Sequence, residues 1–185
     1  MGGKQLPSGG GKSSLLRAVA GLWNAGSGTI VRPDPIDMLF LPQHPYMMIG
    51  SLRRQLLYPS IETDVPNATL LNLLRSVNLP DLAERFGGLD VELDWGKVLS
   101  IGEQQRLAFA RVFLAKPRYA ILDEATSALD TRNEEHLYQQ LRSTSTTVVS
   151  VSHHSTIVKF HDQVLQLTGD GKWQLGSAHE YSTGR

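Results

Sequence analysis

A glycine-rich segment near the start of the chain places the strongest constraint on what this sequence can fold into. It reads Ser8-Gly9-Gly10-Gly11-Lys12-Ser13-Ser14, and an amphipathic helical pattern follows over Ser13–Leu22. Successive glycines let backbone N–H groups turn toward phosphate oxygens, and a helix N-terminus adds partial positive charge. Lys12 could then reach the β- and γ-phosphates of a nucleotide, and the Ser13 hydroxyl could ligate Mg²⁺. The segment predicts a phosphate-binding loop; the alternative is a flexible Gly/Ser turn.

The segment departs from the full G-x-x-x-x-G-K-[ST] template at its first glycine. That position is Leu6, and the preceding residues Met1–Gln5 are polar and glycine-rich where a strand normally leads into such a loop. Leu6 adds strain if the position needs a glycine conformation. We therefore expect either that the domain has lost its N-terminal strands or that the chain starts inside it.

Strand-like apolar runs alternate with helical stretches, which predicts an α/β layer structure with at least part of its sheet parallel. The middle of the chain, about residues 51–98, has few strand signals and predicts a helical subdomain. The helix opened by Thr131 shows capping-box spacing to Glu134. The expected strands are Ile36–Leu41, Tyr119–Leu122 and Thr146–Val151, with Val164–Leu167 and Trp173–Leu175 as a hairpin around Gly169-Asp170-Gly171. The expected helices are Ser13–Leu22, Ser51–Leu57, Ala68–Val77, Pro80–Phe86, Gly102–Ala115 and the one that begins near Thr131 and ends at Leu141.

Composition excludes several classes of function. The 185 residues suit one domain, and 18 basic against 18 acidic residues give a formal net charge of zero. A neutral chain has no long-range attraction for a polyanion, so nucleic acid is not an expected partner. The absence of cysteine excludes disulfides, zinc fingers, iron–sulfur clusters and thiol catalysis. The longest apolar runs are far shorter than the ~20 residues of a membrane-spanning helix.

The segment Leu99-Ser100-Ile101-Gly102-Glu103-Gln104-Gln105-Arg106 has two interpretations. Ser100 and Glu103 form an S-x-x-E capping box, which is a sufficient local reason for both residues. The box does not explain Gly102, because glycine in the first turn of a helix costs up to about 1 kcal/mol relative to alanine. A second phosphate contact would account for Gly102.

Two adjacent carboxylates end the apolar strand Tyr119–Leu122. Asp123 and Glu124 would lie at the carboxyl edge of a parallel sheet, where α/β proteins bind ligands. We expect Asp123 to hold Mg²⁺ through water and Glu124 to orient and deprotonate an attacking water. The alternative is a solvated acidic pair at a strand end.

The six histidines do not predict a metal site. Adjacent His153 and His154 point to opposite faces of an extended chain, and no cluster has ligand spacing.

Taken in order, these segments resemble the nucleotide-binding domain of ATP-binding cassette (ABC) transporters over almost the whole chain. Gly9–Ser14 resembles the Walker A loop, Leu41-Pro42-Gln43 the Q-loop and Leu99–Gln104 the signature. The other matching segments are Ala120–Glu124 for Walker B, Ser127-Ala128-Leu129-Asp130 for the D-loop, and Val149–His153 for the switch-histidine strand. The resemblance implies a single domain over residues 1–185. In it, a P-loop core with a mainly parallel sheet carries the inserted helical subdomain, the signature helix starts at residue 100, and N-terminal antiparallel strands are missing.

Finer features resemble subfamily D and its bacterial relatives, which are half transporters for very-long-chain acyl-CoA, cobalamin or peptides. The segments that carry this likeness are Gly21-Leu22-Trp23, Leu41–Tyr46, Gly50–Arg53, Leu57-Tyr58-Pro59 and Phe160-His161-Asp162. The ATPase domain of such proteins does not touch the substrate, so the likeness selects none of these.

The resemblance implies that two copies sandwich two ATP molecules, each between one Walker A loop and the opposite signature. Ser100 and the Gly102 N–H would contact the γ-phosphate of the partner's ATP, with Glu103 beside them. Gln43 would sense Mg²⁺ and the attacking water and link to the membrane domain. Asp130 would organise the dimer seam, and His153 would hold the γ-phosphate and Glu124. The nucleotide site would thus comprise Ser8, Gly9, Gly10, Gly11, Lys12, Ser13, Ser14, Ser100, Gly102, Glu103 and Asp130, with Ser13, Gln43 and Asp123 at the metal and Glu124, His153, Lys12 and Gln43 in catalysis.

Some residues depart from the family pattern. The signature differs at Ile101 and Glu103, and Ser152 and His154 flank the switch histidine where subfamily D relatives often have Gly and Arg. Family members stack adenine on an aromatic residue upstream of Walker A, but no aromatic precedes Trp23 here. We therefore expect weak Mg-ATP binding, little preference for adenine, and slow or no hydrolysis from this chain.

The resulting hypothesis is an ATPase that powers transport, attached to a membrane through a transmembrane domain encoded upstream, with the ATPase facing the cytosol. Its expected partners are that domain and a second ABC domain, and its expected ligands are ATP and Mg²⁺. Two alternatives are a soluble ABC ATPase of DNA repair or translation and a fragment that no longer binds ATP.

Overall fold

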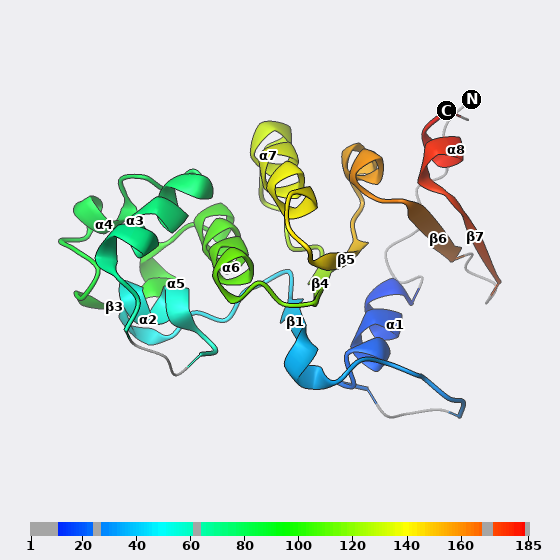
Figure 1. Ribbon diagram of the computed structural model, residues 1–185, viewed down its shortest axis with the longest axis horizontal. Helices are drawn as coiled ribbons and strands as arrows, with labels where there is room; N and C mark the ends of the chain where they lie inside the picture. The colour runs from blue at the N-terminus through cyan, green and yellow to red at the C-terminus, as the bar shows by residue number, and fades with distance from the viewer. Residues whose placement is uncertain (1–10, 24–26, 61–63, 168–171, 184–185) are drawn as a thin grey trace.

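Three parallel strands form the sheet that positions the site. They are β1 (Met38–Leu41), β4 (Tyr119–Asp123) and β5 (Thr147–Val151), in the order β1-β4-β5. In this computed structural model, residues 11–23, 27–60, 64–167 and 172–183 are described (Figure 1). The predictions made on Leu6, Ser8, Gly9, Gly10 and the Gly169–Gly171 turn lie outside those residues. The α/β class with a parallel sheet is confirmed.

Strand β4 lies in the middle because its side chains are apolar on both faces. Ala120, Ile121 and Leu122 are all buried, as expected of a central parallel strand. The strand predicted from Ile36 begins two residues later than expected. The Asp34 side chain accepts a hydrogen bond from the Ile36 N–H at 3.0 Å and starts a short 3-10 turn, η1 (Pro35–Asp37), before β1.

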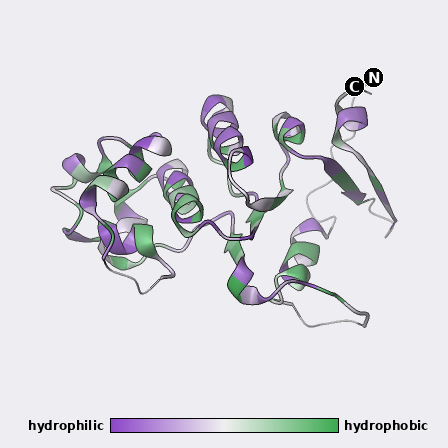
Figure 2. Ribbon diagram, in the orientation of Figure 1, coloured by the Kyte–Doolittle hydropathy of each residue, from purple (hydrophilic) through white to green (hydrophobic). Residues whose placement is uncertain are grey.

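Helices cover both faces of the sheet. Helix α1 (Lys12–Val19) packs against β4 and β5 from one side, while α6 (Ile101–Ala115) and α7 (Thr131–Arg142) lie on the other (Figure 1). Helix α7 is mostly hydrophilic in Figure 2. Its buried residues recur at helical spacing, at Glu134, Leu137, Tyr138 and Leu141. This single stripe explains why a polar segment forms a stable surface helix.

The predicted helical subdomain is present at the left of Figure 1. It contains α2 (Leu52–Leu57), α3 (Asn67–Ser76), α4 (Leu82–Arg85) and α5 (Trp95–Val98). It also contains a short antiparallel pair, β2 (Ile49–Ser51) and β3 (Glu92–Asp94), and neither of these strands was predicted. The pair is joined to the subdomain core, because fully buried Trp95 donates its indole N–H to the carbonyl of Gly50 on β2 at 2.7 Å.

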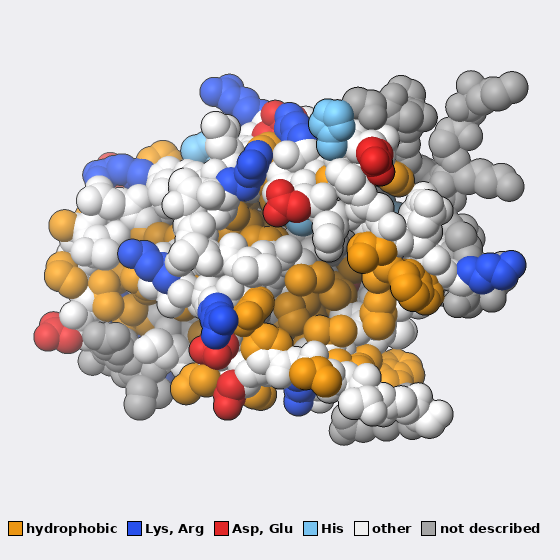
Figure 3. Space-filling view, turned by 45° about the vertical axis from the view of Figure 1, so that its right-hand side comes forward, with side chains coloured by type: hydrophobic (Ala, Val, Ile, Leu, Met, Phe, Trp, Pro, Cys, Tyr) orange, Lys and Arg blue, Asp and Glu red, His pale blue; other side chains and the backbone are white. Residues whose placement is uncertain are grey.

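The C-terminal part consists of η2 (Ser155–Phe160), the antiparallel pair β6 (Gln163–Leu167) and β7 (Trp173–Ser177), and α8 (Ala178–Thr183). The predicted hairpin strands are thus confirmed. Large apolar side chains, including Trp173, Leu165 and Leu175, are more than 45% exposed. Figure 3 shows hydrophobic side chains gathered across the middle and lower part of one face. Such patches are typical of surfaces that contact other protein segments.

Over the described residues, no helix combines the length and hydropathy needed to span a bilayer.

Lys116 ends helix α6 in the left-handed backbone region, at φ 46°. The left-handed conformation strains a non-glycine residue by about 1–2 kcal/mol, and glycine would remove this strain. Part of the gain is offset because glycine raises the conformational entropy of the unfolded chain. Lys116→Gly will therefore raise the free energy of unfolding by about 0.5–1 kcal/mol in urea titrations. Lys97→Gly, inside helix α5, will lower it, as glycine does at helical positions. Equal effects of the two substitutions would contradict the argument.

Candidate nucleotide site

The start of helix α1 presents free backbone donors beside a hydroxyl and a lysine. Gly11 precedes the helix in the left-handed conformation, at φ 79°, which glycine adopts without strain. Among the described residues, no side chain caps this helix and its first turn holds no acid. Its N–H groups are thus available to an anion. Lys12 and Ser13 are half-buried in this first turn, whereas Ser14 is exposed.

Ser13 and Asp123 meet, although 110 positions separate them in the sequence. The Ser13 hydroxyl donates to Asp123 Oδ1 at 2.8 Å. Asp123 is buried as the last residue of β4, and α1 packs across that end of the strand. Two of the three residues predicted at the Mg²⁺ ion, Ser13 and Asp123, therefore lie side by side at the carboxyl edge of the sheet.

Glu124 follows in a strained conformation. Its φ is +52°, a region that costs a non-glycine residue about 1–2 kcal/mol. Its backbone N–H donates to the Val151 carbonyl at 2.9 Å and continues the β4–β5 pairing by one bond. The pairing on either side maintains this strained backbone conformation, and strained residues of this kind are common at functional sites.

His153 lies against Glu124. Its Nε2 is 2.8 Å from Glu124 Oε1, and the side chains are 40% and 20% exposed. His153 follows β5, whose last residue pairs with Asp123. The neighbouring parallel strands β4 and β5 thus bring Glu124 and His153 into contact. This is the contact predicted between a general base and a switch histidine.

Gln43 lies just beyond β1 and is tied into the site through its backbone. Its carbonyl accepts from Gln105 Nε2 at 2.9 Å. The same Gln105 amide donates to Ser127 Oγ at 3.2 Å and accepts from the Ala128 N–H at 3.0 Å. Gln105 is fully buried and joins the segments after β1 and β4. This role of Gln105 was not predicted from the sequence, because its partners are backbone atoms or lie far away along the chain.

Ser100 and Glu103 form the expected capping box at the start of α6. Ser100 Oγ accepts from the Glu103 N–H at 3.3 Å, and Glu103 Oε2 accepts from the Ser100 N–H at 2.9 Å. Arg85 adds an ion pair that was not predicted, with Nη2 2.5 Å from Glu103 Oε1. Burial opposes ionisation of Glu103, but the hydrogen bonds from Arg85 and Ser100 outweigh it and hold the pKa of this carboxyl below its ordinary value.

Gly102 has a packing reason of its own. A Cβ built on it would lie 3.1 Å from the carbonyl oxygen of Ala128. The close approach of the D-loop segment therefore favours glycine at this position, in addition to the predicted phosphate contact of its N–H.

Asp130 caps helix α7, which corrects the capping box predicted on Thr131. Its carboxylate accepts from the Asn133 N–H and from Asn133 Nδ2, both at 2.8 Å. The Asn133 hydrogen bonds, backbone first, lower the pKa of Asp130. An aspartate in extended conformation is the better N-cap because its side chain reaches the third N–H of the helix.

The buried carboxylate of Glu134 anchors the loop that follows β5 and carries His153 and His154. Glu134 is 1% exposed and accepts from Thr126 Oγ1 at 2.7 Å and from Thr156 Oγ1 at 2.7 Å. His154 Nδ1 lies 2.9 Å from it. His153 and His154 thus turn to different carboxylates, as expected of neighbours in extended chain. This supporting role of Glu134 was not predicted from the sequence.

The residues predicted at the signature stand apart from the catalytic pair within one chain. Among the hydrogen bonds of the described residues, none joins Ser100, Gly102 or Glu103 to Ser13, Asp123, Glu124 or His153. Metal-binding clusters of three or more His, Asp or Glu are also absent from the described part of the chain.

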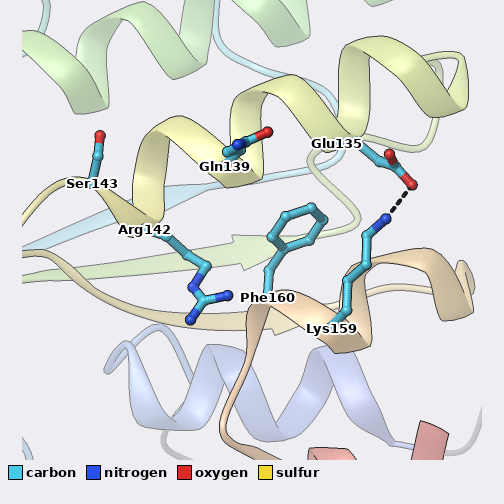
Figure 4. Close-up of a pocket in the computed structure, with 6 residues that line it drawn as sticks. All are labelled: Glu135, Gln139, Arg142, Ser143, Lys159 and Phe160. Atoms are coloured by element: carbon cyan, nitrogen blue, oxygen red, sulfur yellow. Dashed lines mark hydrogen bonds and ion pairs between the residues drawn. The ribbon is translucent and has the colours of Figure 1, made fainter.

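A separate depression of about 520 Å³ lies between α7 and η2 (Figure 4). Its lining includes the Lys159–Glu135 ion pair at 2.6 Å, with Arg142 and Phe160 beside it. None of the predicted site residues lines it, so it is not the nucleotide site.

Comparison with known proteins identifies the family. A family model described as "ABC transporter" matches residues 7–127. The chain belongs to this family. An uncharacterized ABC transporter ATP-binding protein of Synechocystis is 60% identical over 91% of this chain and 26% of its own length. The human lysosomal cobalamin transporter is 43% identical over 91% of the chain and 29% of its own length.

Structural comparison agrees with this ABC assignment. A bacterial Atm1-family ABC exporter with ATP bound superposes with a TM-score of 0.81 and 26% identity, over 96% of this chain and 34% of the exporter. The chain thus spans about a quarter to a third of the length of these ABC relatives.

Proposed function

We propose that this chain binds and hydrolyses ATP and so powers transport across a membrane, as the nucleotide-binding domain of an ABC half transporter. The observation that carries the proposal is the convergence at one sheet edge of the Ser13–Asp123 and Glu124–His153 pairs, each joined at 2.8 Å. A phosphate-binding helix start, two oxygen ligands and a base with its partner meet there, as nucleotide hydrolysis requires.

The Ser13–Asp123 pair fits Mg²⁺. A hydroxyl and a carboxylate oxygen at hydrogen-bonding distance are both hard oxygen ligands, which Mg²⁺ prefers alongside phosphate oxygens and water. Ser13 and Asp123 would hold the ion, with Gln43 nearby. When bound, the ion would neutralise charge on the phosphates.

Glu124 and His153 supply the hydrolytic chemistry. The Glu124 carboxylate takes a proton from water as the water oxygen bonds to the γ-phosphorus and the bond to the bridging oxygen breaks, leaving ADP and inorganic phosphate. His153 hydrogen-bonds Glu124 and holds its orientation toward the water. Lys12 stabilises charge on the leaving phosphates.

A second ABC domain completes each site. Ser100 and the N–H of Gly102 lie at the start of the 15-residue helix α6, an anion-binding position that makes no hydrogen bond to the described phosphate-loop residues Lys12, Ser13 and Ser14. In the proposed dimer they contact the γ-phosphate held by the partner, and Asp130 lies near the seam.

A groove beside Gln43 suits the transmembrane domain. It encloses about 230 Å³ between the core and the helical subdomain, and continues from the Q-loop. Its lining is mainly apolar and aromatic: Leu39, Phe40, Leu41, Pro42, Pro45, Tyr46, Tyr58, Pro59, Ala108 and Arg111. A segment of the transmembrane domain docked there would transmit movement to Gln43, with the ATPase on the cytosolic side.

The printed names of the relatives favour transport over the soluble alternatives. They include the human lysosomal cobalamin transporter and a chloroplastic ABC transporter D family member of Arabidopsis thaliana. These differing names favour a transporter without indicating one substrate.

Mixed dimers test the proposal. Lys12→Ala removes a phosphate ligand from one site, and Ser100→Arg blocks the signature of the other subunit. Each variant alone will hydrolyse little ATP, but a mixture of the two will regain part of the wild-type rate, because one composite site keeps both motifs intact. The measurement is steady-state phosphate release from the single variants and from their mixture. Activity that stays proportional to protein concentration on dilution, with no recovery in the mixture, would contradict a shared site.

A further inference from the structure

The hydroxyl hydrogen of Ser100 is used in a hydrogen bond within the same helix turn, to Glu103. Ser100 Oγ donates to Glu103 Oε2 at 2.8 Å, and a serine hydroxyl has only one hydrogen to give. In the proposed function this hydroxyl donates to the γ-phosphate of the partner's ATP. The Glu103 carboxylate therefore competes with the phosphate for Ser100.

Glu103 also places a negative charge in the first turn of α6. That turn is where the proposed γ-phosphate approaches, so an unpaired carboxylate would repel ATP. Arg85 on α4 forms an ion pair with Glu103, and its Nη2 lies 2.5 Å from Glu103 Oε1. The Glu103 side chain is only 15% exposed, so solvent screens it weakly.

We propose that Arg85 is a positioning residue for the signature. It neutralises Glu103 and so allows the Ser100 hydroxyl and the α6 N-terminus to turn to the phosphate. The inference rests on the proposed function and names a residue of the helical subdomain that acts on the same site through Glu103.

The alternative is that the ion pair merely fastens α4 to α6. The two explanations predict opposite changes in ATP affinity for the Glu103→Gln variant. Glutamine at position 103 keeps the capping box, because Ser-x-x-Gln caps a helix as Ser-x-x-Glu does. If the pair only fastens, Arg85→Gln and Glu103→Gln both weaken ATP binding. If Arg85 cancels a charge, Glu103→Gln strengthens it.

The experiment measures the ATP concentration that half-saturates hydrolysis, and, in a Glu124→Gln background, the one that half-saturates dimer formation by analytical ultracentrifugation. We expect Arg85→Gln to raise both by about tenfold with kcat within about twofold. Glu103→Gln is expected to lower both about threefold, and the double variant to fall between the single ones. Lys97→Gln, which breaks the exposed Lys97–Asp94 pair at 2.9 Å, is the matched control and will leave both unchanged.

Thermal unfolding separates stability from positioning. Arg85→Gln and Glu103→Gln both lose the ion pair and will lower Tm alike, while their ATP dependences move in opposite directions. The inference is overturned if Arg85→Gln leaves the ATP dependence unchanged, or if Glu103→Gln weakens binding as Arg85→Gln does. Wild-type protein that binds no ATP at all would refute the proposed function itself, and the inference with it.

Discussion

Glu124→Gln will lower the steady-state rate of ATP hydrolysis by about 10²- to 10⁴-fold while ATP binding persists. The amide cannot accept a proton from water, and general-base catalysis contributes a factor of that order. Glutamine has the same shape and can still hydrogen-bond His153, which lies 2.8 Å from the carboxylate. Binding will therefore survive and the ATP-bound dimer will accumulate, because the step that dissolves it is slow. Phosphate release and size-exclusion chromatography with ATP measure the two effects.

Glu135→Gln is the matched control for this prediction. Glu135 lies on α7 and pairs with Lys159 at 2.6 Å, outside the catalytic pair. Its substitution will leave hydrolysis within about twofold of wild type, as surface ion pairs contribute little. An unchanged rate in Glu124→Gln would show that another group activates the water.

The sequence predicted the site better than it predicted what supports the site. Lys12, Ser13, Asp123 and Glu124 were identifiable because phosphate chemistry requires those residue types directly after strands or at a helix start, whereas His153 was identified through the resemblance to ABC domains. A parallel sheet then brings strand ends to one edge without further information. The Ser13–Asp123 contact across 110 positions follows from this rule.

The supporting contacts could not be predicted in the same way. Gln105, Glu134 and Arg85 each act through partners that lie far away in the sequence or are backbone atoms, and a single sequence carries no signal for such pairs. Local rules failed where two of them compete. Asp130 and Thr131 are both good helix caps, and only the observed extended backbone of Asp130 selects it.

A buried cation holds the helical subdomain to the core. Arg111 on α6 is 5% exposed, and its Nε donates to the Gln55 carbonyl at 2.7 Å. Its Nη1 donates to the Tyr46 carbonyl at 2.9 Å, and its guanidinium lies 5.1 Å from the Tyr58 ring centroid. Gln55 is in the last turn of α2, and the N–H four residues on is missing because that residue is Pro59. Arg111 thus satisfies a helix-end carbonyl that the helix cannot.

Arg111→Met will consequently lower the free energy of unfolding by about 2–4 kcal/mol. Methionine fills the volume but donates nothing, so the carbonyl of fully buried Gln55 loses its charged donor. Burial lowers the pKa of Arg111 to about 10, which still leaves the guanidinium charged at neutral pH, so these are charge-assisted hydrogen bonds. Removing the cation also ends its desolvation cost, which is why the expected loss is smaller than the sum of the bonds.

Urea unfolding at pH 7 checks this expectation against Arg54→Met on the same α2 helix. Arg54 is exposed, and its substitution will change the free energy of unfolding by no more than about 0.5 kcal/mol. Equal losses in the two variants would show that Arg111 contributes no more than a surface arginine. Because Tyr46 and Tyr58 also line the groove beside Gln43, the joint that Arg111 stabilises is the one through which the proposed transmembrane domain would act. Arg111→Met should therefore also loosen the coupling between that groove and hydrolysis, at temperatures where the variant is still folded.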